Sequence, residues 1–225
     1  MRLGVRLAAI VLALGVAACA GNEADPLTLE QRVPDAAEAP GTEPDPVETR
    51  VSVTGLEEFE AEILARAETV TDEDVRALGD AGFVSAIRDT RFYPGEPGGA
   101  HSGEVPHIFT LVLQFDSEEG AREAVEFMHE FNLRPCPDTC AFDFAEFDVD
   151  GTPDAVGSSQ IATQESLDAV GDPEDPYAIY AVDFADGFFV YDIALAGPPE
   201  EVSEQQLEEI AETLYERVAG APPAE

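Results

Sequence analysis

Regular alternation of apolar and polar residues marks the strands of this chain. The stretch 107–115 alternates, with its apolar residues on one face, which is the pattern of a strand that has one side in a core. The stretches 177–184 and 188–195 are the clearest strands, and Asp186-Gly187 between them is a strong signal for a hairpin turn. Weaker patterns predict further strands over residues 83–93, 142–149 and 157–163.

Apolar residues at helical spacing predict two long helices. Ser117 is a good N-cap for a helix over 118–131. Ser203, followed three residues later by a glutamine, forms a capping box for a helix over 204–218 with a continuous apolar stripe. Two shorter helices are expected over residues 56–67 and 71–82.

The order of these elements predicts an α+β fold. Strands and helices segregate into strand–strand–helix groups, which favours a single antiparallel sheet with helices packed mainly on one face. The order of the group over 83–131 returns over 157–218, which suggests an internally duplicated strand–strand–helix unit. Regular periodicity holds throughout residues 51–220, a length typical of a single domain.

The N-terminal residues 1–18 have the pattern of a signal peptide. Arg2 and Arg6 give a positive start, and the apolar run 7–16 that follows is shorter than the roughly 20 residues of a membrane-spanning helix. Small residues then precede Cys19.

The sequence Val16-Ala17-Ala18-Cys19 resembles the lipobox of bacterial lipoproteins. The resemblance implies cleavage before Cys19, attachment of a diacylglycerol-type anchor to its thiol, and a position on the extracytoplasmic face of the cell membrane. Two acyl chains hold a protein durably. The alternative is plain secretion with an incidental cysteine.

Flanking segments are predicted to lack structure. Residues 19–50 are rich in Pro, Glu, Asp and Ala, with few large apolar residues, so we expect a disordered tether that lifts the domain off the membrane. The last residues, 221–225, are expected to form a disordered tail.

The charge of the chain is strongly negative. It has 48 acidic residues against 11 Arg, with no Lys, for a net charge of −37. Such a surface excludes nucleic acid as a partner and repels anionic lipids, so the lipid anchor must supply the membrane contact. The acidity either collects cations or is a solvated coat suited to salty or alkaline surroundings.

Motif absences argue against an enzyme. Without Lys there is no Walker A loop, no Schiff-base site and no Ser-Lys dyad, and neither G-x-S-x-G nor G-x-G-x-x-G occurs. We expect no catalytic residues and no cofactor.

Cys136 and Cys140 are the two cysteines left after lipidation. Outside the membrane such a pair is expected to form a disulfide. Alternatively, Cys136-Pro137-Asp138-Thr139-Cys140 resembles the CPDxC motif of the Sco family, which delivers copper, and thiolates suit Cu(I). In that family a downstream His completes the site, whereas this chain has none after His129. The second candidate function is therefore copper or divalent-cation handling by the Cys pair and carboxylates.

Other candidate metal ligands carry weaker signals. His101, His107 and His129 lack metal-binding spacing and are expected to be ordinary surface or half-buried histidines. The acidic clusters over 148–154 and 172–175 do not match an EF-hand loop. We expect no dedicated metal site.

The overall layout loosely resembles extracellular sensor domains of actinobacterial Ser/Thr kinases and the surface lipoproteins of the same bacteria. The residues that carry it are LVLQFDSEEGAREAV, the central Cys pair, Gly-Thr-Pro-Asp-Ala and the closing DGFFVYDIAL. It implies a non-enzymatic ligand-binding or sensing module of the cell envelope, with an unknown small molecule or envelope protein as partner. A pocket between sheet and helices would be lined by Phe109, Tyr180, Phe189 or Tyr191; alternatively these aromatics fill the core.

Overall fold

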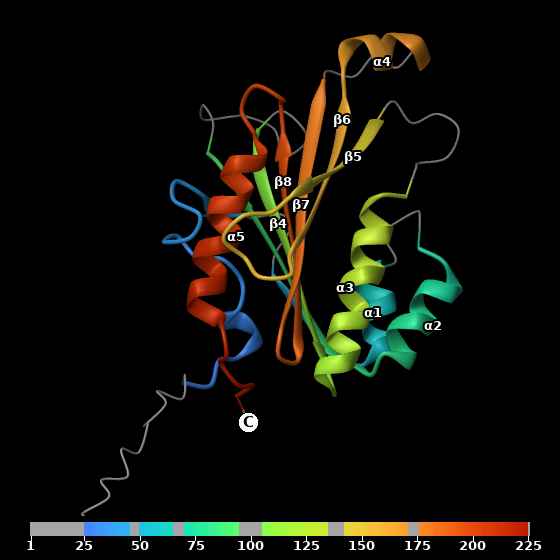
Figure 1. The fold of residues 1–225 in the computed structure, drawn as a ribbon, viewed down its shortest axis with the longest axis vertical. Coiled ribbons are helices and arrows are strands. Elements are labelled where there is room, and N and C mark those ends of the chain that lie inside the picture. Colours follow the sequence, from blue (N-terminus) through green and yellow to red (C-terminus); the bar gives the residue numbers. More distant parts are fainter. Residues whose placement is uncertain are drawn as a thin grey trace, which may run out of the picture.

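The protein is an eight-stranded sheet with helices against it (Figure 1). The computed structural model describes residues 25–45, 50–64, 70–94, 105–134, 142–170 and 176–224. In chain order the elements are η1 (Leu29–Gln31), β1 (Glu43–Pro44), β2 (Val51–Thr54), α1 (Leu56–Glu62), α2 (Asp72–Asp80), β3 (Phe83–Phe92), β4 (His107–Phe115), α3 (Glu118–Asn132), β5 (Phe142–Asp148), β6 (Val156–Ala162), α4 (Gln164–Val170), β7 (Tyr177–Asp186), β8 (Phe189–Gly197) and α5 (Glu204–Val218).

All strand pairs in the sheet are antiparallel, and the order is β1-β3-β4-β8-β7-β6-β5, with β2 also paired to β3. The predicted α+β class and single antiparallel sheet are confirmed. The hairpin predicted at Asp186-Gly187 joins β7 to β8, and Gly187 takes a positive φ of 58° there. Strands β1 and β2 and helix α4 lie where the sequence pattern predicted no element.

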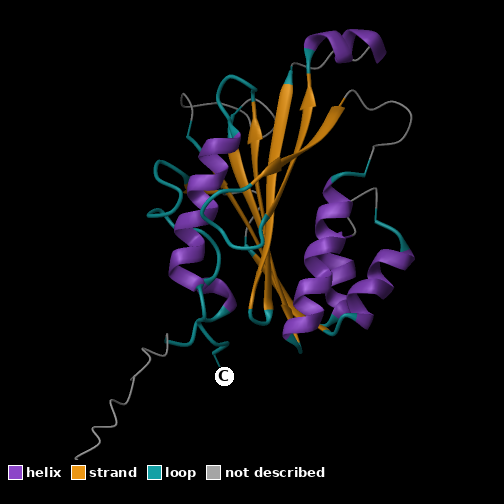
Figure 2. Ribbon diagram, in the orientation of Figure 1, coloured by secondary structure: helices purple, strands orange, loops and turns teal. Residues whose placement is uncertain are grey.

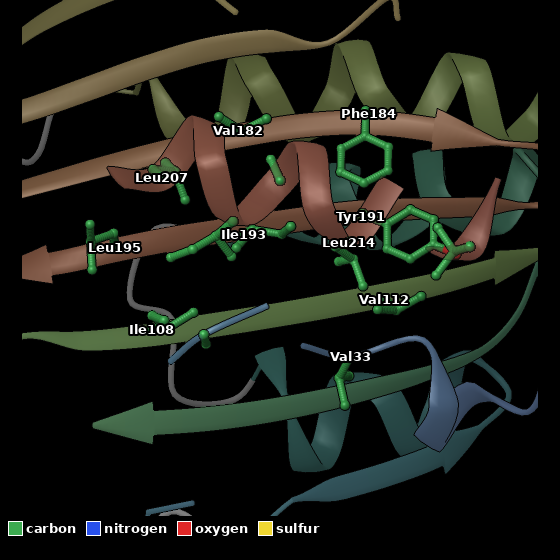
Figure 3. Packing of buried hydrophobic residues seen from close by; sticks show 14 of the residues in the cluster. Val33, Ile108, Val112, Val182, Phe184, Tyr191, Ile193, Leu195, Leu207 and Leu214 are labelled. Carbon is green, nitrogen blue, oxygen red and sulfur yellow. The ribbon is translucent and has the colours of Figure 1, made fainter. Parts of the chain in front are cut away.

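Helices cover both faces of the sheet (Figure 2). Helices α1, α2 and α3 gather on one face, which we call the α3 face, and share a core with Leu111 and Val190. Helix α5 packs on the opposite face, the α5 face. Figure 3 shows Phe184 and Tyr191 there beneath this helix, and their rings stack with centroids 4.7 Å apart. Alternate residues of β7 and β8 therefore face two different cores.

The two long helices begin where their caps predict. Ser117 accepts a hydrogen bond from the Gly120 backbone N–H, and Ser203 accepts one from Gln206. Gly120 also permits a close approach, because a Cβ at this position would lie 1.9 Å from the carbonyl oxygen of Ala81. A side chain at residue 120 would thus force the first turn of α3 away from the end of α2.

The repeated order of elements does not extend to a repeated arrangement in space. The hairpins β3–β4 and β7–β8 meet through the antiparallel pair β4–β8. Because β4 and β8 are antiparallel, the rotation that superposes one hairpin on the other has its axis perpendicular to the sheet. Such a rotation does not exchange the two faces of the sheet. A true repeat would therefore place α3 and α5 on the same face. Helices α3 and α5 lie on opposite faces.

Residues 25–45 are packed against the sheet, so the predicted tether is wrong for this segment. Val33 and Ala39 join the core of the α5 face with exposures of 2% and 0%. Polar anchors explain why a Pro- and acid-rich segment is ordered: Glu38 forms an ion pair with Arg217, and Arg32 is fully buried.

The chain ends also differ from prediction. Ala221 is buried, and the backbone N–H groups of Leu27 and Ala224 donate to the carbonyls of Pro222 (3.0 Å) and Leu27 (3.2 Å), respectively. Residues 221–224 are therefore held beside the N-terminal segment rather than forming a free tail. Among the described residues no helix is long and apolar enough to cross a membrane.

Arg32 fastens these segments to the core. Its guanidinium lies 3.6 Å from the centroid of the Phe189 ring. It donates to the Tyr191 hydroxyl at 2.8 Å and to the carbonyls of Ala221 and Pro222 at 2.5 and 3.0 Å. No carboxylate of the described residues lies within ion-pair distance of Arg32. Hydrogen bonds and the aromatic face surround its charge, and the Asp186 carboxylate attracts it from farther away.

Replacing Arg32 tests this role. Arg32→Ala leaves the Tyr191 hydroxyl and the Ala221 carbonyl without this donor, while the Pro222 carbonyl keeps the Leu27 N–H, and we expect the substitution to lower the free energy of unfolding by about 2–4 kcal/mol in urea denaturation. The matched control is Arg122→Ala, which removes only an exposed pair with Glu118 and should change stability by less than about 0.5 kcal/mol. Equal effects of the two substitutions would contradict the role given to Arg32.

Candidate functional site

Two buried aspartates lie side by side at the centre of the sheet. Asp183 on β7 is directly opposite Asp192 on β8, and their exposures are 0% and 5%. Both project to the α3 face, in line with Leu111 of the adjacent strand β4. Like charges at directly opposed positions repel, so this pair cannot be two carboxylates at no cost.

Helix α3 supplies the polar partners of the pair. The Asn132 side-chain amide donates to both carboxyl oxygens of Asp183, at 3.4 and 3.2 Å, and to Oδ1 of Asp192 at 3.5 Å. Gln160 on β6 donates to the Asn132 carbonyl at 2.7 Å, which fixes the end of the helix over the sheet. Among the described residues no Arg forms an ion pair with either aspartate.

Burial makes these acids hold protons more tightly. Loss of solvation raises the pKa of Asp183 well above its ordinary value, and the nearby Asp192 charge raises it further, while the Asn132 amide opposes the shift. Burial raises the pKa of Asp192 to about 6, against the hydrogen bonds from Asn132 and Asp183. Two coupled acids of this kind share a proton, which Asp183 retains more strongly.

His129 connects the pair to the surface. It lies one turn before Asn132 on α3, and its Nδ1 is 3.9 Å from Oδ2 of Asp183. Its Nε2 is 2.8 Å from Oε1 of Glu146 on β5. The Nδ1 atom is buried and forms no hydrogen bond among the described residues. The imidazole thus stands between a buried acid and an exposed one, since the Glu146 side chain is 69% exposed.

A cleft of about 510 Å³ opens beside His129. Its other lining residues come from β5, β6 and the turn between them: Glu146, Phe147, Asp148, Val149, Ala155, Val156 and Gly157. The wall depends on Gly157, because a Cβ there would lie 2.4 Å from the Phe147 ring, which rests on the glycine backbone. The same ring meets Tyr180 edge-on at 6.4 Å.

The lining defines what this cleft can bind. Two carboxylates and an imidazole make most of the open surface polar and supply negative charge and hydrogen bonds, and the aliphatic residues and Phe147 add a small apolar area. A small molecule with a positive group would match this surface, and a short apolar part would contact the apolar area. The cleft can attract a cation electrostatically and remove part of its water shell. The described part of the cleft contains no nucleophile–base pair.

The aromatic pocket considered from the sequence is not formed. Phe189 and Tyr191 are buried in the core of the α5 face, and Tyr180 packs against the same core. Phe109 belongs to the core of the α3 face, on the other side of the sheet. Because strand residues alternate between faces, these four side chains cannot line one cavity. Phe189 and Tyr191 fill the core, as the alternative interpretation expected, and Phe109 and Tyr180 are half-buried against it.

Within the described chain the remaining candidate residues do not join this site. Cys19, Cys136, Cys140 and His101 lie outside the described residues. His107 is half-buried, and its Nε2 is 3.4 Å from the Tyr177 hydroxyl. No group of three His, Cys, Asp or Glu side chains in the described ranges could hold a metal ion.

Sequence reasoning missed the residues at the centre of the site. Asp183 and Asp192 each interrupt a strongly apolar strand, in AVDFAD and VYDIAL. Charged residues in strands buried on both faces are rarely tolerated without a partner, so this interruption was the available signal. Asn132, by contrast, is the last residue of a helix and carried no such signal.

The comparisons with known proteins place the fold. No protein-family model matches the chain. No curated protein matches it either. Among solved structures it is similar to the crystal structure of the extracellular domain of PknH from Mycobacterium tuberculosis, with a TM-score of 0.52 and 12% identity over 86% of this chain and 97% of that one. At this identity the likeness shows a shared fold, which agrees with the loose resemblance to kinase extracellular domains.

The buried pair predicts a definite pH dependence. Both pKa values are raised in the folded protein, so the folded state binds more protons than the unfolded state. The contribution of the pair to the free energy of unfolding is therefore fully present below about pH 4. It is lost as the pH rises through about 6 and beyond. Asp192→Asn removes the charge, and we expect it to stabilise the protein by about 1–3 kcal/mol at pH 8 and to have little effect at about pH 4, where this aspartate is largely protonated even in the unfolded chain.

Urea denaturation at both pH values measures this difference. The control is Asp143→Asn, which removes one charge from an exposed position of β5 and therefore reports general charge repulsion alone. If Asp192→Asn stabilised no more than this control at pH 8, the pair would not be under electrostatic strain.

Proposed function

We propose that this chain is a lipid-anchored, non-enzymatic module outside the cytoplasm that binds a small cationic ligand in the cleft beside His129. The observation that carries the proposal is the chain of contacts from the cleft to the core. Glu146 lies at the cleft, His129 contacts it, and His129 in turn lies 3.9 Å from the buried Asp183. A charge bound at the surface is thereby sensed by a buried acid.

The electrostatics favour a cation over an anion or a neutral ligand. The cleft carries Glu146 and Asp148, and the chain as a whole has a net charge of −37, which raises the local concentration of cations. The small apolar area of the lining would accommodate a short aliphatic portion of such a ligand. Absence of a three-ligand group in the described ranges points the same way.

The proposed address rests on the lipobox resemblance at Cys19 and is supported by the fold shared with an extracellular domain. The packing of residues 25–45 changes the expected geometry of the anchor. Only residues 20–24 separate Cys19 from the first described residue, so the domain would be held close to the membrane instead of on a long tether.

Hexylamine is a suitable probe because it joins an ammonium group to a short apolar chain. We expect it to shift the backbone amide NMR signals of Glu146, Val156 and Gly157, and Glu146→Gln to weaken its apparent affinity about tenfold by removing one close charge. The matched control, Glu126→Gln, removes an exposed carboxylate from α3 outside the cleft and should leave the affinity within about twofold.

Two outcomes would overturn the ligand assignment. One is the absence of localised shifts with hexylamine while uncharged hexanol produces them, which would make the cleft an apolar site. The other is an equal loss of affinity in Glu146→Gln and Glu126→Gln, which would reduce the binding to attraction by the overall charge.

A further inference from the structure

We propose that one end of the sheet, formed by the β7–β8 turn and the first residues of β3, contacts the lipid headgroup layer to which the chain is anchored. This inference rests on the proposed lipid at Cys19, and it adds an interaction surface and an orientation to the proposed function. It follows from where the N-terminal segment is held, how much chain precedes it, and which side chains are exposed at that end.

The N-terminal segment is fixed at this end of the molecule. The Leu27 backbone N–H donates to the Pro222 carbonyl at 3.0 Å, and the Ala224 N–H donates to the Leu27 carbonyl at 3.2 Å. Arg32, fully buried, donates to the carbonyls of Ala221 and Pro222. The beginning of the described chain therefore cannot swing away from the end of α5.

The same end carries the β7–β8 turn. The Gly220 N–H, just after α5, donates to both carboxyl oxygens of Asp186 at 3.1 and 3.0 Å, and Asp186 is the last residue of β7. Figure 1 shows the C-terminus, the start of the described N-terminal segment and the β7–β8 turn at the same end of the sheet. An anchor attached to the N-terminal segment pulls this end toward the membrane.

The reach of the intervening chain is short. Six residue steps separate Cys19 from Asp25. At no more than about 3.5 Å per residue they span at most about 20 Å. A domain on so short a connection has its nearest end within contact distance of the headgroups, and rotation of the whole domain away from the membrane is limited.

The exposed large apolar residues of the described chain lie at this end. Phe188 and Val84 are the two, with exposures of 37% and 36%. Phe188 sits in the turn, where its carbonyl accepts a hydrogen bond from the Phe115 N–H at 2.8 Å. Val84 is the extra residue where the pairing of β3 with β4 shifts register, so it has no place in either core. Phe83, next to Val84, pairs with Phe115, and Phe115 is bonded to Phe188, so the backbones of Val84 and Phe188 are about 10 Å apart, which is two strand spacings.

Charge sets the depth of the contact. Asp116, Asp186 and Glu118 lie at the same end, and carboxylates do not enter the hydrocarbon layer. The contact is therefore shallow, with Phe188 among the headgroups, and the lipid supplies the attachment. Glu146 is level with Ala181 across the sheet, and Ala181 is five residues before Asp186 on β7. The cleft therefore lies about 17 Å from this end of the sheet and stays in solvent.

The protein has no Trp, so a single introduced Trp reports its own surroundings. Phe188→Trp is made in the full-length lipoprotein, which is purified from membranes and reconstituted in phosphatidylcholine vesicles containing lipids brominated near the headgroup. Val84→Trp is a second reporter. Phe144→Trp is the matched aromatic control on β5, level with Ile179 and about 25 Å from this end of the sheet.

We expect the brominated lipids to quench the fluorescence of the Phe188→Trp and Val84→Trp variants several-fold more than that of Phe144→Trp. The emission of the Phe188→Trp variant should also shift to the blue on reconstitution. Vesicle flotation and the intact mass of each sample report the anchor separately from the orientation.

Two results would overturn the proposal, and they are distinguishable. If the protein floats with a lipid on Cys19 but Phe188→Trp and Val84→Trp are quenched no more than Phe144→Trp, the orientation is wrong and the anchor stands. If the mass shows no lipid and the protein does not float, the anchor is wrong, and the membrane contact fails with it.

Discussion

The structure depends on the burial of β7 and β8 from both sides. Helix α5 covers one face of these strands and α3 the other, so the side chains at the middle of both strands are shut off from water. In a chain with 48 acidic residues, two of these positions are aspartates, Asp183 and Asp192. The structure accommodates these aspartates with polar groups from α3. The Asn132 amide at the end of this helix donates to both acids, and the His129 imidazole lies between Asp183 and the exposed Glu146.

The proposed binding function depends on this constraint. The proton shared by the two aspartates is held by burial, and a route from it to solvent runs past His129 to Glu146 at the cleft. A cation bound beside Glu146 would therefore lie next to the imidazole whose Nδ1 is 3.9 Å from Asp183. If the module is sensory, a change of charge at the surface would be transmitted to the position of α3, since Asn132 on that helix is bonded to both acids.

Much of the fold could be predicted from the sequence, because the patterns that define it are local. The alternation in β4, β7 and β8 and the caps Ser117 and Ser203 indicated the correct class, the hairpin and both long helices. The N-terminal segment could not be predicted in this way. It is polar, and its order depends on single long-range contacts: Arg32 reaches Tyr191, and Arg217 reaches Glu38. No local pattern encodes such pairs.

The candidate site likewise contains residues that the sequence indicated and residues that only long-range contacts bring together. His129 was a candidate from residue type alone, whereas its partners Glu146 and Asp183 come from strands far along the chain, and only the strand register brings them together. The predicted aromatic pocket failed because face assignment depends on register: Phe109 and Tyr191 are on opposite sides of one sheet. The cysteines Cys19, Cys136 and Cys140 lie outside the described residues, so the lipid anchor and the disulfide stay predictions.

The most direct test of this account is to follow the carboxyl carbons of Asp183 and Asp192 by carbon-13 NMR as the pH is raised. We predict that the pair keeps one proton at neutral pH, so that one carboxyl signal stays at the protonated position long after the exposed aspartates have titrated near about pH 4. If both signals moved to the carboxylate position near about pH 4, the pair would be solvated or otherwise neutralised, and the link from cleft to core would not exist.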